Sequence, residues 1–102
     1  MDRVQHVLAR LKSLFLELGF KETVVSNQYR NEKNYVCGNL YCIPQYVERI
    51  GFLIEYADSL EEAQKHWHED GDAIPLSISD EIILANLKAE ILSAMKDAGL
   101  LP

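Results

Sequence analysis

Apolar residues recur every three or four positions near the N-terminus, which is the spacing of one face of an α-helix. The pattern covers residues 2–18 and is formed by Val4, Val7, Leu8, Leu11, Leu14, Phe15 and Leu18. Gly19 follows directly, and glycine readily takes the left-handed conformation that ends a helix. Phe20 is then placed to pack back onto Phe15, so the sequence predicts a helix that stops at Gly19.

The C-terminal region repeats this arrangement. Ser79 suits the N-cap, and Asp80 and Glu81 suit the positive end of the helix dipole. The apolar stripe consists of Ile83, Leu84, Leu87, Ile91, Leu92, Met95 and Ala98. Gly99 is the predicted stop, so we expect a helix between Ser79 and Gly99.

A shorter helix is predicted to begin at Asp58 or Ser59. Asp58 and Glu61 have the spacing of a capping box, in which each side chain accepts a hydrogen bond from an unpaired N–H group. Ser59 and Glu62 have the same spacing, and the sequence leaves both alternatives open. The helix is expected to continue as far as Gly71, along a narrow apolar stripe of Leu60, Ala63 and Trp67.

The segment 22–56 is rich in β-branched and aromatic residues, which favour strands. A first strand is predicted around Thr23-Val24-Val25, and a polar turn at Asn31-Glu32-Lys33-Asn34. The apolar run Ile50–Ala57 predicts another, mostly buried strand.

Residues Tyr35–Ile43 allow two interpretations. We expect a single strand with Gly38 at a bulge or close approach. In the alternative, Gly38-Asn39 is the two-residue turn of a hairpin with a shorter strand on either side. In both cases Pro44 is expected to break the hydrogen-bonding ladder, because proline has no N–H to donate.

Together these elements predict one α+β domain over residues 1–102, in the order α-β-β-β-α-α. The expected architecture is a small antiparallel three-stranded sheet with the helices packed on one face. No apolar run approaches the roughly 20 residues that a membrane-spanning helix needs. Basic residues also interrupt the apolar run that a secretion signal would need near the N-terminus. We therefore expect a cytoplasmic protein with no membrane partner.

The two cysteines, Cys37 and Cys42, are five residues apart. On one strand this spacing separates their Cα atoms by about 16 Å, whereas a disulfide needs a separation below about 7 Å. We expect two free thiols. A C-x4-C pair with no second pair also does not match the spacing of a zinc site.

The net charge of −6 is unevenly distributed along the chain. Residues 1–51 hold seven Lys or Arg and five Asp or Glu, a balance of +2. Residues 52–102 hold three Lys or Arg and eleven Asp or Glu, a balance of −8. An acidic surface repels the phosphates of nucleic acids and suits a basic protein partner.

The densest polar cluster is His66-Trp67-His68-Glu69-Asp70-Gly71-Asp72, which contains the imidazole and carboxylate groups that bind transition metals. On a helix, His66 and His68 lie on opposite sides of the axis and cannot bind one ion. Glu62, His66 and Asp70 are each four residues apart on one face and are the better candidate metal set. The other interpretation is a solvated helix end that binds no cofactor.

Neither a G-x-S-x-G nucleophile motif nor a phosphate-binding glycine loop is present in the sequence. We therefore expect a non-enzymatic protein-interaction module, with a regulatory role or a role like that of small acidic immunity and antitoxin proteins. The expected partner-binding residues are Glu61, Glu62, Trp67, Glu69, Asp70 and Asp72.

The alternative is a small metal- or ligand-binding protein, enzymatic or not, that uses Glu62, His66 and Asp70. Homodimerisation through an exposed edge of the sheet is compatible with both hypotheses.

Overall fold

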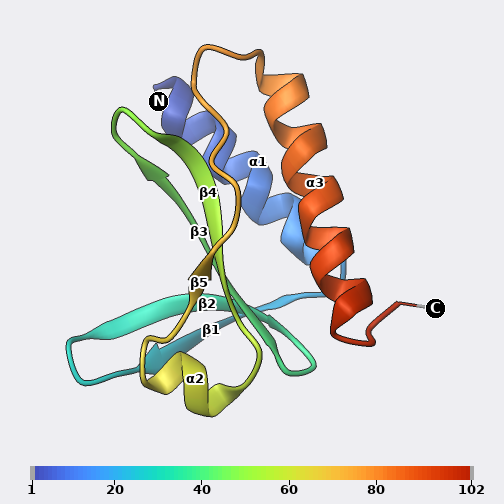
Figure 1. The fold of residues 1–102 in the computed structure, drawn as a ribbon. Helices are drawn as coiled ribbons and strands as arrows, with labels where there is room; N and C mark the ends of the chain where they lie inside the picture. The colour runs from blue at the N-terminus through green and yellow to red at the C-terminus, as the bar shows by residue number, and fades with distance from the viewer. Residues whose placement is uncertain (1, 102) are drawn as a thin grey trace.

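The computed structural model describes residues 2–101 and contains a five-stranded antiparallel sheet in the order β1-β2-β3-β4-β5 (Figure 1). The elements are α1 (Arg3–Glu17), β1 (Lys21–Ser26), β2 (Asn31–Cys37), β3 (Leu40–Val47), β4 (Gly51–Ala57), α2 (Leu60–Gln64), β5 (Glu69–Asp70) and α3 (Asp80–Asp97). The chain is α+β as predicted, but the predicted three-stranded sheet and the order α-β-β-β-α-α are wrong. The observed order is α-β-β-β-β-α-β-α.

The prediction of a turn at Asn31–Asn34 is wrong, because this polar run is the start of β2. The turn lies earlier, where Oδ1 of Asn27 accepts hydrogen bonds from the backbone N–H groups of Tyr29 (2.8 Å) and Arg30 (3.0 Å). Asparagine favours this local turn because its side chain reaches the backbone two residues later. Because Asn31–Asn34 belongs to a strand, two of its polar residues, Glu32 and Asn34, are buried.

The expected single strand over Tyr35–Ile43 is also wrong, and the alternative hairpin is correct. Cys37 and Leu40 pair across a two-residue turn at Gly38-Asn39, and Gly38 has a φ of 57°. Left-handed geometry of this kind suits the two-residue turns that match the twist of a hairpin. Cys37 and Cys42 consequently lie on adjacent strands, and both are free thiols.

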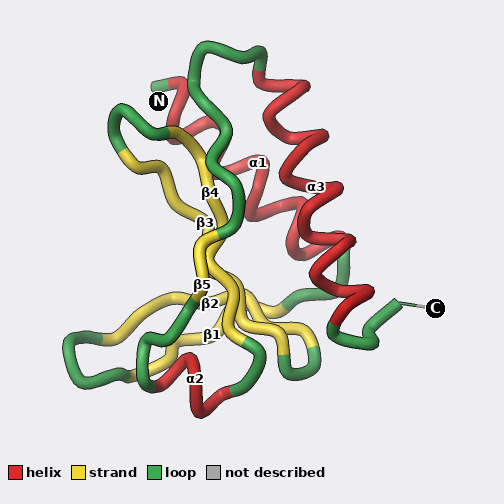
Figure 2. The backbone as a smooth tube through the Cα atoms, viewed as in Figure 1, coloured by secondary structure: helices red, strands yellow, loops and turns green. Residues whose placement is uncertain are grey.

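Pro44 does not end a strand; it lies inside β3, opposite Ile54 of β4. β2 pairs with β3 only as far as Cys42, so Pro44 lies where the β2 side of β3 has become an open edge. Proline is tolerated at such an edge because no ladder bond is lost. Figure 2 shows the consequence: the β1–β2 hairpin and the β3–β4 hairpin run apart beyond this point.

The two long helices form as predicted and lie side by side on one face of the sheet (Figure 1). Both end as expected: the N–H of Phe20 donates to the carbonyl of Phe15 (3.0 Å), and the N–H of Leu100 donates to that of Met95 (2.8 Å). The buried core between the helices and the sheet includes Val7, Leu11, Phe15, Phe20, Tyr35, Leu40, Cys42, Phe52, Ile54, Ile83, Leu87, Ile91 and Met95. Within residues 2–101, no helix has the length and apolar character needed to cross a membrane.

The opposite face of the sheet is covered in part by α2, so the prediction that all helices pack on one face is wrong. Ala63 of α2 packs with Val25 and Ala57 and against Tyr41. Successive residues of a strand point to opposite faces, and these strand residues alternate with the core residues beneath α1 and α3. This second face carries the candidate site.

Candidate partner-binding surface

The segment from Asp58 to Asp72 leaves the sheet after β4, forms α2 and returns at β5. It begins as one of the two predicted capping arrangements. Oγ of Ser59 accepts from the N–H of Glu62 (3.1 Å), and Oε1 of Glu62 accepts from the N–H of Asp58 (3.0 Å). The carboxylate of Glu62 is therefore used to hold the start of α2.

α2 ends at Gln64, about two turns earlier than the predicted end at Gly71. The N–H of Trp67 donates to the carbonyl of Glu62 (2.9 Å), which closes the helix with a Schellman-type turn. His66 occupies the left-handed position of this turn, with a φ of 58°. Glycine usually fills this position, and a residue with a Cβ is strained there. The early stop lets the chain turn back to pair with β4.

The structure places five of the six predicted partner-binding residues at the surface. These are Glu61, Trp67, Glu69, Asp70 and Asp72, whereas Glu62 is half-buried. The side chain of Trp67 is 62% exposed, and the Nζ atom of Lys65 lies 4.5 Å from the centre of its ring. A lysine over an indole is a cation–π contact, which holds the ring in place without covering both faces.

The three candidate metal ligands are not arranged on one helical face. Glu62 belongs to α2, His66 follows the end of that helix, and Asp70 pairs with Glu55 in the sheet. Across residues 2–101, no group of three or more His, Cys, Asp or Glu side chains is arranged to hold a metal ion.

The sequence reasoning missed a polar layer that joins β2 to the loop after α2. Glu32 is 9% exposed and Asn34 is fully buried, both on the face that α2 covers. Nδ1 of His66 lies 2.8 Å from Oε1 of Glu32, and Nε2 of His68 lies 3.0 Å from Oδ1 of Asn34. Alternating buried polar residues in β2 are matched by alternating histidines 34 residues later. This matching spacing of two residues was the signal in the sequence that could have indicated the polar layer.

Burial and neighbouring charges shift the pKa values of His68 and Glu55 in this layer. Burial lowers the pKa of His68, and the adjacent His66 lowers it further, whereas Glu32 and Glu62 oppose the shift. Burial also raises the pKa of Glu55, and the negative charge of Asp70 raises it further. The layer thus favours a neutral His68 at the pH where a free histidine would begin to take up a proton.

A small cavity of about 130 Å³ opens beside the polar layer and is lined by Asn27, Tyr29, Arg30, Glu32 and His66. It brings the turn between β1 and β2 next to the end of α2. Tyr29 is 73% exposed, so the cavity lies at a surface with an exposed aromatic side chain.

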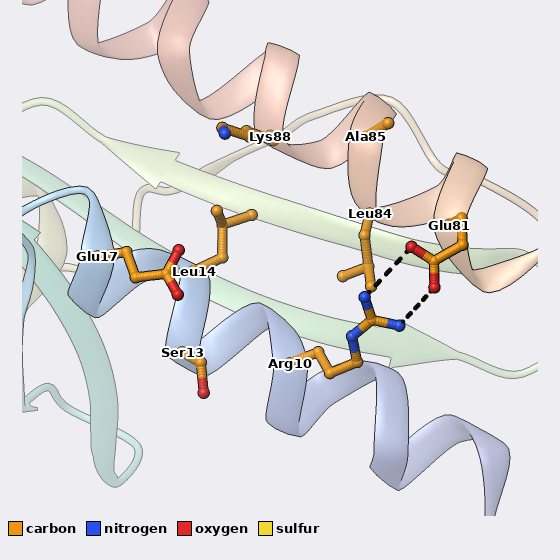
Figure 3. Close-up of a pocket in the computed structure, with 8 residues that line it drawn as sticks. All are labelled: Arg10, Ser13, Leu14, Glu17, Glu81, Leu84, Ala85 and Lys88. Carbon is orange, nitrogen blue, oxygen red and sulfur yellow. Dashed lines mark hydrogen bonds and ion pairs between the residues drawn. The ribbon is translucent and has the colours of Figure 1, made fainter.

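A larger groove of about 430 Å³ lies between α1 and α3 (Figure 3). Arg10 reaches across it to both carboxylate oxygens of Glu81, at 2.8 and 3.3 Å. Leu14 and Leu84 project between the two helices (Figure 3). The ion pair ties α1 to α3, and the groove presents mixed charges and no cluster of reactive groups.

Comparison with protein-family models, with curated proteins and with solved structures found no match for this chain. The candidate site consequently stands on its own geometry: an exposed tryptophan among carboxylates, next to a small polar cavity.

Proposed function

We propose that this protein is a cytoplasmic protein-interaction module that binds a basic protein partner through the Trp67 surface. This surface consists of Glu61, Glu62, Trp67, Glu69, Asp70 and Asp72. The observation that carries the proposal is the exposed Trp67 ring next to carboxylates on the same segment. Tryptophan is enriched at the energetic centres of protein interfaces, because it buries a large area at little entropic cost.

The charge distribution supports a basic partner. The second half of the chain has a balance of −8, and the Trp67 surface contributes five of its eleven carboxylates. Complementary charge accelerates association and selects against acidic partners, and its contribution falls as salt rises. A role like that of an immunity protein or antitoxin fits this arrangement, as does a regulatory role.

The experiment is affinity capture from an extract of the source cells with four immobilised proteins. These are the wild type, Trp67→Ala, E69K/D70K and the charge-matched control E17K/E48K, whose substituted positions are exposed and lie at the end of α1 and in the turn between β3 and β4. We expect a basic protein to be retained by the wild type and the control, and lost with the other two and at high salt. Equal retention by all four proteins would refute the proposal.

A further inference from the structure

The small cavity next to the end of α2 is lined by a nearly buried carboxylate residue, Glu32. Glu32 is nine-tenths buried, yet it lines a cavity of about 130 Å³ together with Tyr29, Arg30 and His66. Pockets for drug-sized ligands are typically about 300–1,000 Å³. A volume of this size, roughly four water molecules, suits the charged head of a single side chain.

The two oxygens of Glu32 have different partners. Oε1 accepts from Nδ2 of Asn27 (2.5 Å) and lies 2.8 Å from Nδ1 of His66. Oε2 is contacted by Arg30, through Nε (3.3 Å) and Nη2 (3.0 Å). Within the described chain, Nδ1 of His66 is buried and makes no hydrogen bond of good geometry. Oε1 therefore contacts two residues, Asn27 and His66, whereas Oε2 contacts Arg30.

That arginine is poorly anchored. The Arg30 side chain is 68% exposed, and it extends from the turn between β1 and β2. Glu32 is only 9% exposed, so its carboxylate needs a cationic partner. The exposed guanidinium can move into water, and an incoming guanidinium would restore the hydrogen bonds that Oε2 loses. Arg30 therefore occupies a position beside Oε2 of Glu32 that a cation from another molecule could take.

The surrounding charge favours a cation. Four carboxylates act electrostatically on this layer, those of Glu32, Glu55, Glu62 and Asp70, against the one guanidinium of Arg30. An exposed aromatic side chain, Tyr29, lines the cavity, and the exposed Trp67 follows the lining residue His66 in the sequence. Arginine side chains bind carboxylates through paired hydrogen bonds and also stack on aromatic rings.

We propose that the Glu32 cavity receives one basic side chain, preferentially an arginine, from the partner, and that Arg30 occupies Oε2 until that side chain replaces it. This inference deepens the proposed function and rests on it. It makes the Glu32 cavity the specific contact within an interface that the Trp67 surface steers by charge.

The test uses hexa-arginine peptide as the probe, with binding followed by the amide NMR resonances of residues 29–33 and by Trp67 fluorescence. The wild type should bind weakly. Arg30→Ala should bind about tenfold more tightly, because Oε2 no longer has an internal competitor and a charged hydrogen bond is gained. Arg30→Lys should behave like the wild type, and Lys21→Ala is the control for loss of one positive charge.

Removing the carboxylate should cancel the gain: Arg30→Ala combined with Glu32→Gln should bind no better than the wild type. A thermal unfolding curve for each variant establishes that it is folded, and Glu32→Asp replaces Glu32→Gln if the latter is not. Hexa-lysine should bind more weakly than hexa-arginine, and hexa-glutamate should not bind. Unchanged affinity in Arg30→Ala, or tighter binding of hexa-glutamate, would overturn the inference.

The two proposals fail in different ways. If capture depends on Glu69 and Asp70 but hexa-arginine binding is insensitive to Arg30 and Glu32, the cavity inference is wrong and the Trp67 surface stands. If capture is insensitive to the charge reversals, the proposed function itself is wrong.

Discussion

His66 and Glu32 lie 2.8 Å apart, Nδ1 to Oε1, although 34 positions separate them in the chain. This contact joins the loop after α2 to β2 and holds the base of the Trp67 surface against the sheet. One partner is a nearly buried carboxylate, and the other has a backbone conformation that disfavours side chains. Both features are costly on their own, so we expect substitutions at either residue to change the stability of this part of the chain.

Glu32→Gln is expected to lower the free energy of unfolding by about 1–3 kcal/mol, because hydrogen bonds to a charged acceptor become weaker neutral ones. Urea unfolding measures the difference. Glu48→Gln, at an exposed position in the turn between β3 and β4, is the control and should change little. Equal stability of the two variants would show that Glu32 is not held by its neighbours.

Replacing His66 separates the side chain from its backbone strain. His66→Ala removes the imidazole and keeps the strained φ of 58°, whereas His66→Gly removes the imidazole and relieves the strain. We expect the glycine variant to be more stable than the alanine variant by about 1 kcal/mol. Chemical unfolding of the pair provides the measurement, and an alanine variant at least as stable would contradict the left-handed turn.

Stability should fall as the pH drops below about 6.5, the pKa of a free histidine. Because the folded state lowers the pKa of His68, the unfolded chain binds its proton first, which favours unfolding as the pH falls. The raised pKa of Glu55 has the opposite effect on stability, because the folded state binds this proton more tightly and gains stability as the pH falls.

The comparison that isolates His68 is the wild type against His68→Gln, unfolded in urea at pH 7.5 and pH 5. We expect the loss of stability between these pH values to be smaller in the variant. A loss of the same size in both proteins would assign the pH dependence to other groups.

Zinc should not bind through Glu62, His66 and Asp70, because α2 ends at Gln64 and the helical register that would align them is not formed. Titration of the untagged protein with zinc is expected to leave Trp67 fluorescence and the thermal midpoint unchanged. A saturable one-to-one response that disappears in His66→Ala would contradict this expectation.

The parts of the fold that sequence predicts correctly are those specified locally. α1 and α3 carry long apolar stripes, N-cap side chains and a glycine at the stop, so each boundary lies within about two residues of its prediction. The Gly38-Asn39 turn was also visible, as the alternative. Local preference and tertiary packing agree at these positions.

The errors concern residues whose environment is set by distant partners. Asn31–Asn34 has the composition of a turn, and the histidines of a remote loop provide partners for the buried Glu32 and Asn34. His66 takes a position that local preference assigns to glycine. β5 has two residues, too few for any periodic pattern. The candidate surface was predicted from charge, and the cavity beside it was not.

The most direct test of the Trp67 surface replaces Trp67 with a photoreactive phenylalanine analogue and crosslinks the protein inside the source cells. The same analogue at Val24 of β1 and at Ile82 of α3, both exposed apolar positions, provides controls on other surfaces. We predict that position 67 crosslinks to a basic protein, and that E69K/D70K abolishes this product. A partner that crosslinks from position 24 or 82 but not from 67, or from 67 regardless of the charge reversal, would contradict the account.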